Sequence, residues 1–380
     1  MTTQSRLKIT DIKLHKIRVI RDLGWIEPAW NVGGKMPFTE GGGTVTEIFT
    51  DGGISGIGPG AHPEVIEAAR THLVGKDPFD TEQHASTMRY YAAQLPYRGA
   101  AGIDIALWDI IGKACGQPLY KLWGGGKDKV PAYASMVRLS TPEERADLAV
   151  RLADEGWQAI KLRIHYQTMK EDVALVEAVV DAVGDRMAVM VDANQAQSSG
   201  NWQPGIQWTF HRAMQTAIEL DQLGVYWFEE PLPRFAFADL ARINAAVAMP
   251  IAGGENNRGF HEFVQMCELG VYDLLQPEGM VLEGLTTLRK IGVLAEAFNK
   301  QICPHHGGRG LGTIAHLHLV ASWPHAPYLE TLHDPPVGEI ETGFSILENP
   351  PTLDKEGFIA VPQGAGLGVD VKRDWIEESI

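Results

Sequence analysis

Three acidic residues in the middle of the chain each stand directly after a short apolar run. They are Asp192, Glu229 and Glu255. Apolar runs of this length, rich in β-branched and aromatic side chains, are typical of buried strands. Helix-like stretches separate them, at residues 213–223 and 235–247. Strands that alternate with helices across short connections pair in parallel, and this pattern constrains the fold more than any other feature.

Parallel strands have all their carboxyl ends on one side, so these three carboxylates are expected to converge. Close carboxylates repel each other, and a divalent cation relieves the repulsion. Ligation by oxygen alone favours a hard metal such as Mg²⁺. Any one of these acids alone could equally be a helix N-cap or a solvated loop residue. Lys161 and Arg163 lie on the run before Asp192, and a cation–acid–acid–acid order on successive strands is the more specific signal.

Four short motifs resemble the enolase superfamily, and within it the acid sugar dehydratases of the mandelate racemase/muconate lactonizing enzyme family. In chain order they are Lys161-Leu162-Arg163, Val191-Asp192-Ala193-Asn194, Phe228-Glu229-Glu230-Pro231 and Gly254-Glu255-Asn256. The resemblance implies a Mg²⁺ ion held by Asp192, Glu229 and Glu255. It also implies an α/β fold, a (β/α) TIM-type barrel with an N-terminal α+β capping domain completed by the C-terminal tail.

Eight strand-like runs support the barrel, because a barrel of this type needs eight strand–helix units. A doubly wound open sheet is the alternative, but it predicts a glycine-rich phosphate loop after the first strand, and the sequence has none there. The runs lie at residues 130–135, 159–164, 188–191, 226–228, 250–253, 273–276, 301–304 and 328–329.

The sequence divides into a capping domain (residues 1–128), a barrel (129–349) and a C-terminal segment that packs on the capping domain (350–380). Residues 28–43 are expected to be a loop because they hold five glycines. By resemblance, two loops near residues 23–40 and 56–63 would close over the barrel mouth. A polar stretch at 198–207 predicts an inserted loop near the site. The capping domain is predicted to hold strands at 7–20, 44–50 and 54–57 and helices at 63–73, 81–93 and 99–115.

Three later strand ends carry further candidates. By resemblance, Glu278 orients His305, which moves a proton near neutral pH, and Glu330 binds the carboxylate of the substrate. Side chains alternate along a strand, so only one of His305 and His306 should point inward. Position along the run and the resemblance favour His305, and His306 is the alternative.

The chain departs from the family pattern at two positions. Glu278 stands where an Asp is usual, and Arg163 stands where a second Lys often acts as a base. A guanidinium group stays protonated and is a poor base, so Arg163 is expected to hold the substrate instead. Lys161 is expected to stabilise the enediolate. Three further candidates each have an ordinary structural alternative: His165 could lie on a surface loop, and Asn194 and Asn256 could cap helices rather than contact substrate.

A single base suits removal of the proton next to a carboxylate followed by loss of a β-hydroxyl. The expected function is therefore Mg²⁺-dependent dehydration of a sugar acid, an aldonate or aldarate, to a 2-keto-3-deoxy acid. One alternative is a racemase or epimerase of a 2-hydroxy acid, with Lys161 opposite His305. Another is a metal-dependent sugar-acid binding protein without turnover.

Composition excludes several other classes. A net charge of −15 with no long basic stretch argues against nucleic acid as a partner. The three cysteines are far apart, and no apolar run is long enough to cross a membrane. Met1–Thr10 is polar and unlike a signal peptide, so a cytoplasmic protein is expected. The family tendency implies a homo-oligomer, a dimer or an octamer.

Overall fold

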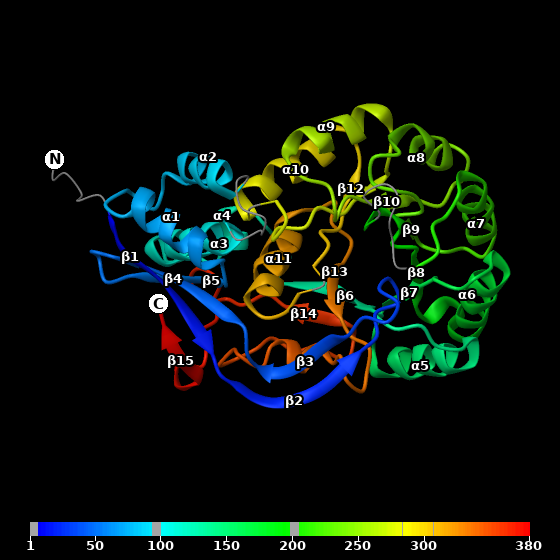
Figure 1. Ribbon diagram of the computed structural model, residues 1–380, viewed down its shortest axis with the longest axis horizontal. Helices are drawn as coiled ribbons and strands as arrows, with labels where there is room; N and C mark the ends of the chain where they lie inside the picture. The colour runs from blue at the N-terminus through cyan, green and yellow to red at the C-terminus, as the bar shows by residue number, and fades with distance from the viewer. Residues whose placement is uncertain (1–6, 93–99, 198–204, 283, 307) are drawn as a thin grey trace.

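The computed structural model describes residues 7–92, 100–197, 205–282, 284–306 and 308–380. Eight parallel strands within these ranges curl around a common interior (Figure 1). Each of the eight predicted runs overlaps one of them. They are β6 (Lys129–Ser135), β7 (Ala159–Arg163), β8 (Ala188–Asp192), β9 (Phe228–Glu229), β10 (Ile251–Gly253), β11 (Leu274–Leu275), β12 (Gln301–Ile302) and β13 (Leu329–Leu332).

The strand order confirms the parallel arrangement. Neighbours in sequence pair from β6 to β12, and β13 returns to pair with β6. The described residues show no backbone ladder between β12 and β13, where Cys303 Sγ donates to the Tyr328 carbonyl at 3.2 Å. The carboxyl ends of all eight strands therefore open on one side, as in a TIM-type barrel.

Helices connect the strands and cover the outside of the barrel (Figure 1). Capping boxes start the first two, where Thr141 pairs with Glu144 and Thr168 with Glu171. Gly156 ends the first helix with a left-handed φ of 106°. The helices are α5 (Pro142–Glu155), α6 (Met169–Val183), α7 (Phe210–Gln222), α8 (Phe237–Asn244), α9 (Phe260–Leu269), α10 (Leu285–Ala297) and α11 (Leu311–Ser322).

Side-chain alternation decides what each strand presents to the barrel interior. On β7, Ile160 and Leu162 pack outward in the main core, whereas Ala159 lies in the interior cluster. Lys161 and Arg163 follow Ala159 at two-residue spacing and share its face. An apolar floor thus lies below a polar upper layer. The floor consists of Tyr133, Ala159, Met190, Trp227, Ala252, Leu274 and Cys303.

The capping domain is an antiparallel sheet covered by helices, in the strand order β15-β1-β4-β5. Its apolar core is separate from that of the barrel and includes Ile12, Ile48 and Ile103. The three predicted helices are present over the described residues, and the predicted end at residue 93 and start at residue 99 fall outside those residues. The elements are β1 (Ile9–Ile17), β4 (Thr44–Thr50), β5 (Ser55–Pro59), α1 (Pro63–Leu73), α2 (Thr81–Ala92), α3 (Ala100–Cys115) and the short α4 (Leu119–Leu122).

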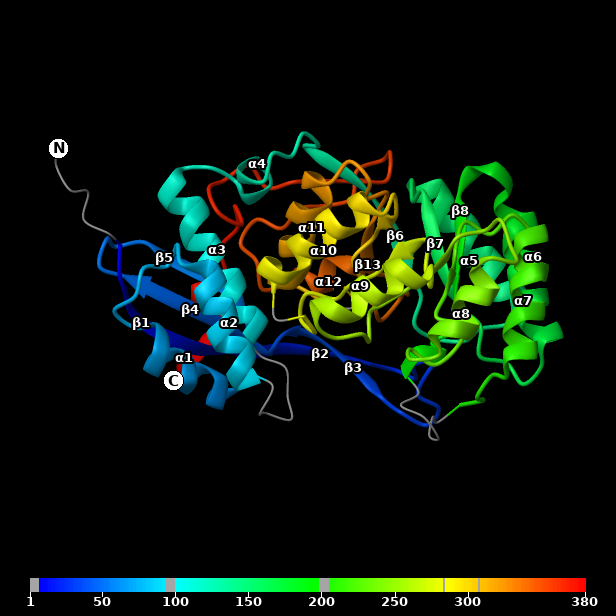
Figure 2. The same cartoon turned by 90° about the horizontal axis from the view of Figure 1, so that it is seen from above.

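A two-stranded ribbon replaces much of the loop expected at residues 28–43. Strand β2 (Val19–Ile26) pairs with β3 (Met36–Gly41), so the loop prediction was wrong for the second half of that range. The glycines that suggested a loop lie at the ends of this ribbon, while Phe38 in β3 is fully buried. Both views show the ribbon leaving the capping sheet and running alongside the barrel (Figure 2).

The C-terminal segment pairs with both parts of the molecule. Strand β14 (Phe358–Ala360) pairs with β6 of the barrel, and β15 (Ile376–Ser379) pairs with β1 of the capping sheet. A short helix, α12 (Ile340–Gly343), precedes them. Within the ranges that the structure describes, no helix has the length and apolarity that crossing a membrane requires.

Candidate active site

Three carboxylates meet at the carboxyl ends of neighbouring strands. Asp192 ends β8, Glu229 ends β9, and Glu255 follows β10. One oxygen from each lies within 4.8 Å of the others, and all three side chains are buried. Asp192 shares a face with Met190, and Glu229 with Trp227, so the period of two turns both acids inward. The structure therefore brings together the three residues predicted to bind metal.

Lys161 lies beneath these carboxylates. Its Nζ is 2.9 Å from Glu229 Oε1, 2.8 Å from Glu330 Oε1 and 3.8 Å from Asp192 Oδ2. The side chain is fully buried. Burial disfavours the ammonium ion, but Glu229 and Glu330 together hold the pKa of Lys161 well above its usual value. Lys161 is thus a fixed cation, and its ion pairs link Glu229 of β9 to Glu330 of β13.

Arg163 is held by a fork of hydrogen bonds at the wall of the site. Its Nη1 donates to Asp192 Oδ2 and, at 3.1 Å, to Asn194 Oδ1. Nη2 donates to Ser135 Oγ at 3.1 Å, and Nε donates to the backbone carbonyl of Met136, the next residue. The guanidinium lies over the ring of Trp30 with its carbon 4.8 Å from the ring centroid. A residue of the capping domain therefore contacts a cation of the barrel.

The candidates near the metal-ligand positions orient those ligands. Asn194 has a left-handed φ of 46°, and both its backbone N–H and its side-chain amide donate to Asp192. His165 is next to the Asn194 oxygen, with Nε2 at 3.1 Å, so it does not lie on a free surface loop. Asn256 donates to Glu255 at 2.8 Å. Of these three, Asn194 and Asn256 also line the cavity described below.

Buried acids outnumber buried cations at this end of the barrel. Burial raises the pKa of Asp192 to about 8, and the nearby Glu229 adds to the shift. Burial and the Glu255 charge also raise the pKa of Glu230 well above its usual value, and Glu230 Oε2 has no hydrogen-bond partner among the described residues. Lys161, Arg163 and His305 face six carboxylates: Asp192, Glu229, Glu230, Glu255, Glu278 and Glu330.

This donor set fits a hard divalent cation. All the ligand atoms on offer are oxygens, they are buried, and they repel each other when ionised, which a cation such as Mg²⁺ would relieve.

His305 and Glu278 form a hydrogen-bonded pair on the other side of the site. His305 Nδ1 is 3.0 Å from Glu278 Oε2, and its Nε2 is 3.0 Å from Glu255 Oε2. Burial opposes a charged ring, but Glu255 and Glu330 raise the pKa of His305 well above its usual value. The ring therefore has one nitrogen on an orienting carboxylate and the other toward the predicted metal ligands. The longer side chain of Glu278 still reaches the histidine.

His306 turns to a different environment. Its backbone N–H donates to Glu330 at 3.0 Å, and its Nδ1 is 3.3 Å from both oxygens of Glu278. Its Nε2 is buried and has no hydrogen-bond partner among the residues described. Of the two adjacent histidines, only His305 points a ring nitrogen toward Glu255.

Glu278, His306 and His316 form a second cluster with the spacing of a metal site. Hydrogen bonds already occupy His316, whose Nδ1–H donates to the Gly312 carbonyl at 2.8 Å. Its Nε2 accepts from the Gly279 N–H at 3.2 Å, and burial lowers its pKa to about 4. The second cluster is therefore best described as a hydrogen-bond network around the Glu278 carboxylate.

A cavity of about 330 Å³ joins these groups. Arg163, Asn194, Glu255, Glu278 and His305 line it from the barrel. Trp30 and Met36 line it from the capping domain, so the segment predicted to close over the barrel mouth does border the site.

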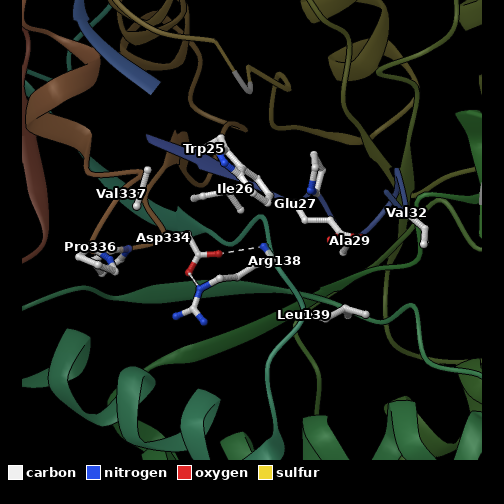
Figure 3. A pocket seen from close by; sticks show the side chains of 12 residues that line it. Trp25, Ile26, Glu27, Ala29, Val32, Arg138, Leu139, Asp334, Pro336 and Val337 are labelled. Carbon is white, nitrogen blue, oxygen red and sulfur yellow. Dashed lines mark hydrogen bonds and ion pairs between the residues drawn. The ribbon is translucent and has the colours of Figure 1, made fainter. Parts of the chain in front are cut away.

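A larger cavity of about 470 Å³ lies beside it, between residues 25–32 and the loops after β6 and β13. Figure 3 shows Arg138 and Asp334 pointing toward one another at this cavity, which is otherwise mainly apolar. Asp334 accepts from the Val137 and Arg138 N–H groups and pairs with Arg145 at 3.1 Å. None of the predicted site residues lines this cavity, and Asp334 serves to tie two loops together.

Several residues that complete the site escaped sequence reasoning. Gln276 and Trp227 donate side-chain N–H groups to Glu229 Oε2, at 2.7 and 3.3 Å. Both could have been predicted from side-chain alternation. Trp227 is two residues before Glu229, and Gln276 is two residues before Glu278, so each pair shares a face. Trp30 and Ser135 carried no comparable local signal.

The fold and this arrangement of carboxylates, lysine and histidine define a barrel enzyme of the enolase type. The chain also matches two family models. Residues 144–375 match the enolase C-terminal domain-like family, and residues 44–124 match the mandelate racemase/muconate lactonizing enzyme N-terminal domain. The protein therefore belongs to the mandelate racemase/muconate lactonizing enzyme family of the enolase superfamily, as the sequence motifs predicted.

Relatives of the chain include enzymes that are named for sugar acids and for a sugar-acid lactone. L-talarate/galactarate dehydratase of Salmonella typhimurium is 32% identical over 78% of this chain and 75% of its own length. D-galactarolactone cycloisomerase of Agrobacterium fabrum is 29% identical over 98% of both chains. A crystal structure of D-glucarate dehydratase from Agrobacterium tumefaciens complexed with magnesium superposes with a TM-score of 0.85, at 28% identity, over 98% of this chain and 99% of that one.

Proposed function

We propose that this protein is a Mg²⁺-dependent dehydratase of a sugar acid. Asp192, Glu229 and Glu255 would hold the ion, which would supply positive charge where negative charge develops on the substrate carboxylate. The observation that carries the proposal is the position of His305, with Nδ1 on Glu278 and Nε2 at the cavity beside Glu255. The dehydratases among the relatives add support for the sugar-acid class.

The chemistry requires one proton carrier. His305 Nε2 takes the proton next to the carboxylate, and the C–H electron pair moves toward that carboxylate. The C–O bond at the next carbon then breaks, and the hydroxyl leaves as water with a proton from the His305 imidazolium. The resulting enol tautomerises to a 2-keto-3-deoxy acid. Glu278 accepts from Nδ1–H throughout and keeps the ring oriented.

The cationic residues suit elimination better than racemisation. A racemase needs a second base opposite His305, and Lys161 is fully buried with its ammonium between Glu229 and Glu330. Arg163 is equally unsuited to proton abstraction because a guanidinium group remains protonated. Both would instead stabilise negative charge, and Arg163 Nη2 would bind an oxygen of the substrate.

One relative suggests a variation on the same chemistry. The cycloisomerase aligns over nearly the full chain and is named for a sugar-acid lactone. Elimination at the carbon next to the acidic position can expel a ring oxygen as readily as a hydroxyl, with the same base. A lactone is therefore included as a second candidate substrate.

The test is a screen of aldonates, aldarates and galactarolactone with Mg²⁺ in D₂O, followed by ¹H NMR. We expect a 2-keto-3-deoxy product from one stereochemical series. Deuterium at the α-carbon without a keto product would instead support a racemase. Tight binding of one compound by calorimetry, without deuteration or product, would support a binding protein and contradict the proposal.

A further inference from the structure

Two imidazole rings share the Glu278 carboxylate. Glu278 Oε2 is 3.0 Å from His305 Nδ1, and both oxygens are 3.3 Å from His306 Nδ1. The Met280 backbone N–H donates to Oε1 at 2.9 Å. With 6% of Glu278 exposed, protein donors replace water around this carboxylate. Burial acts to raise the pKa of Glu278, but the electrostatic effect of His306 and hydrogen bonds from His305 and His306 hold it well below its usual value.

The surroundings of His306 are shaped to hold its ring in one place. The ring stacks on His316 with centroids 4.5 Å apart and an angle of 15°. On its other edge, a methyl group added at Gly308 or Gly312 would come within 2.6 Å of the His306 ring. His316 is itself hydrogen-bonded at both nitrogens. The His306 ring therefore lies between a fixed ring and two glycines that leave it just enough space.

The two ring nitrogens of His306 have different surroundings. His306 Nδ1 must carry the hydrogen because it faces a carboxylate. His306 Nε2 is buried against Gly308 and Gly312, and it has no hydrogen-bond partner in the described part of the chain. His306 and Gly308 border the cavity, but His306 Nδ1 lies on Glu278 and Nε2 is buried against the glycines. The side-chain contact through which His306 acts is therefore the one with Glu278.

We propose that His306 is a positioning residue that clamps Glu278 so that Glu278 holds His305 in a single orientation. The proposal rests on the proposed function, in which His305 is the base. The proposal also explains how a Glu can stand at position 278, where an Asp is usual. The extra methylene of Glu278 adds a rotatable bond, and the hydrogen bond from His306 restricts rotation about it. His306 and His316 thus form a support behind the Glu278–His305 pair.

The test compares His306→Leu with His306→Asn, two side chains of the same branching of which only Asn keeps a donor near Nδ1. Turnover is measured with the best substrate of the sugar-acid screen. We expect His306→Leu to lower kcat by about 10- to 100-fold with KM nearly unchanged, the cost of a slightly misplaced catalytic group. His306→Asn should recover most of that loss. Mg²⁺ affinity, measured by calorimetry with the metal alone, should be the same in both variants.

A second measurement tests the effect of His306 on His305 without measuring turnover. ¹⁵N-histidine NMR of the Mg²⁺-loaded protein, at a pH where the His305 ring is neutral, reports which His305 nitrogen carries the hydrogen. We expect one tautomer in the wild type and in His306→Asn, and a mixture in His306→Leu. If His306→Leu does not fold, Gly312→Ala takes its place, because its methyl group pushes the His306 ring off Glu278.

The outcomes separate the two proposals. Wild-type kcat and an unchanged His305 tautomer in His306→Leu would overturn the clamp. Equal losses in the Leu and Asn variants with an unchanged tautomer would also overturn it, since His306 would then act by another route. If no sugar acid is turned over, the proposed function fails, while the NMR comparison still decides whether His306 positions His305.

Discussion

The two sides of the barrel mouth handle buried charge in opposite ways. On the side of β8 to β10, the carboxylates of Asp192, Glu229 and Glu255 lie close together, and Glu230 is next to them. The cations nearby are too few to balance these four charges. On the side of β11 and β12, Glu278 meets two histidines and a backbone N–H. The first side needs a cation from outside the chain, whereas the Glu278 carboxylate on the second side already has hydrogen-bond donors from the protein.

This difference indicates which side binds a metal ion and which side orients His305. An unbalanced group of buried carboxylates is costly unless a cation joins it. A carboxylate that already accepts several hydrogen bonds is stable as it stands, and it can fix the direction of whatever donates to it. Cluster spacing alone does not separate the two cases, because both sides have the spacing of a metal site.

The first test concerns the charge of the metal-binding side. Glu255→Gln removes one charge from the metal-binding side, and we expect Mg²⁺ affinity to fall about 100-fold, in the range seen when a metal site is disturbed. Turnover should fall with it. Titration calorimetry with Mg²⁺ measures the first effect, and product formation at saturating Mg²⁺ measures the second. Unchanged Mg²⁺ affinity would remove Glu255 from the metal site.

His305→Asn is the matched variant on the other side. It should lower turnover by about 10³-fold, as expected for loss of a general base, without weakening Mg²⁺ binding. Weaker Mg²⁺ binding in His305→Asn would mean that the two sides are not separate in function.

Strand periodicity explains how much of this site could be predicted from sequence. The run before Asp192 shows that Asp192 shares a face with Met190, and the same rule places Glu229 and His305 inward. The eight strands and their parallel order followed from the alternation of apolar runs with helices.

What could not be predicted depends on contacts between distant segments. Trp30 lies over Arg163 only because the β2–β3 ribbon crosses from the capping domain to the barrel. Its second strand, β3, was predicted to be a loop because residues 28–43 hold five glycines. His306 reaches Glu278 through the backbone path after β12, which no local pattern specifies. The predicted insertion at residues 198–207 falls mostly outside the described residues.

Arg163 is expected to affect turnover less than His305 does. Arg163→Lys keeps the charge but loses the fork that reaches Asn194 and Ser135, so we expect dehydration to slow by about 10-fold. Lysine can also act as a second base. The ratio of α-deuteration to keto product should therefore rise, measured by NMR in D₂O with the best substrate. Arg163→Gln is the control, because it loses the fork without gaining a base. An equal ratio in both variants would show that position 163 does not reach the α-carbon.

Glu47 is a buried carboxylate far from the site, and its hydrogen-bond partners are all groups of the protein. Glu47 accepts from Ser55 and Arg373 and pairs with His15 at 2.8 Å, which joins β1, β4 and the C-terminal segment. Burial acts to raise its pKa, but His15 and Arg373 outweigh it and lower the pKa to about 2. A lowered pKa in the folded state means that this stabilisation is complete above about pH 4.5 and is lost as the pH falls toward 2.

Glu47→Gln should therefore lower the free energy of unfolding by about 1–2 kcal/mol at pH 6, with allowance for solvent screening, and by much less at pH 3. Urea unfolding of both proteins at the two pH values measures the difference. Mg²⁺ should stabilise wild type and variant equally, because Glu47 lies outside the metal site. A difference that stays constant between pH 6 and 3 would show that the charge of Glu47 contributes nothing, and one that changes with Mg²⁺ would link the capping sheet to the metal-binding side.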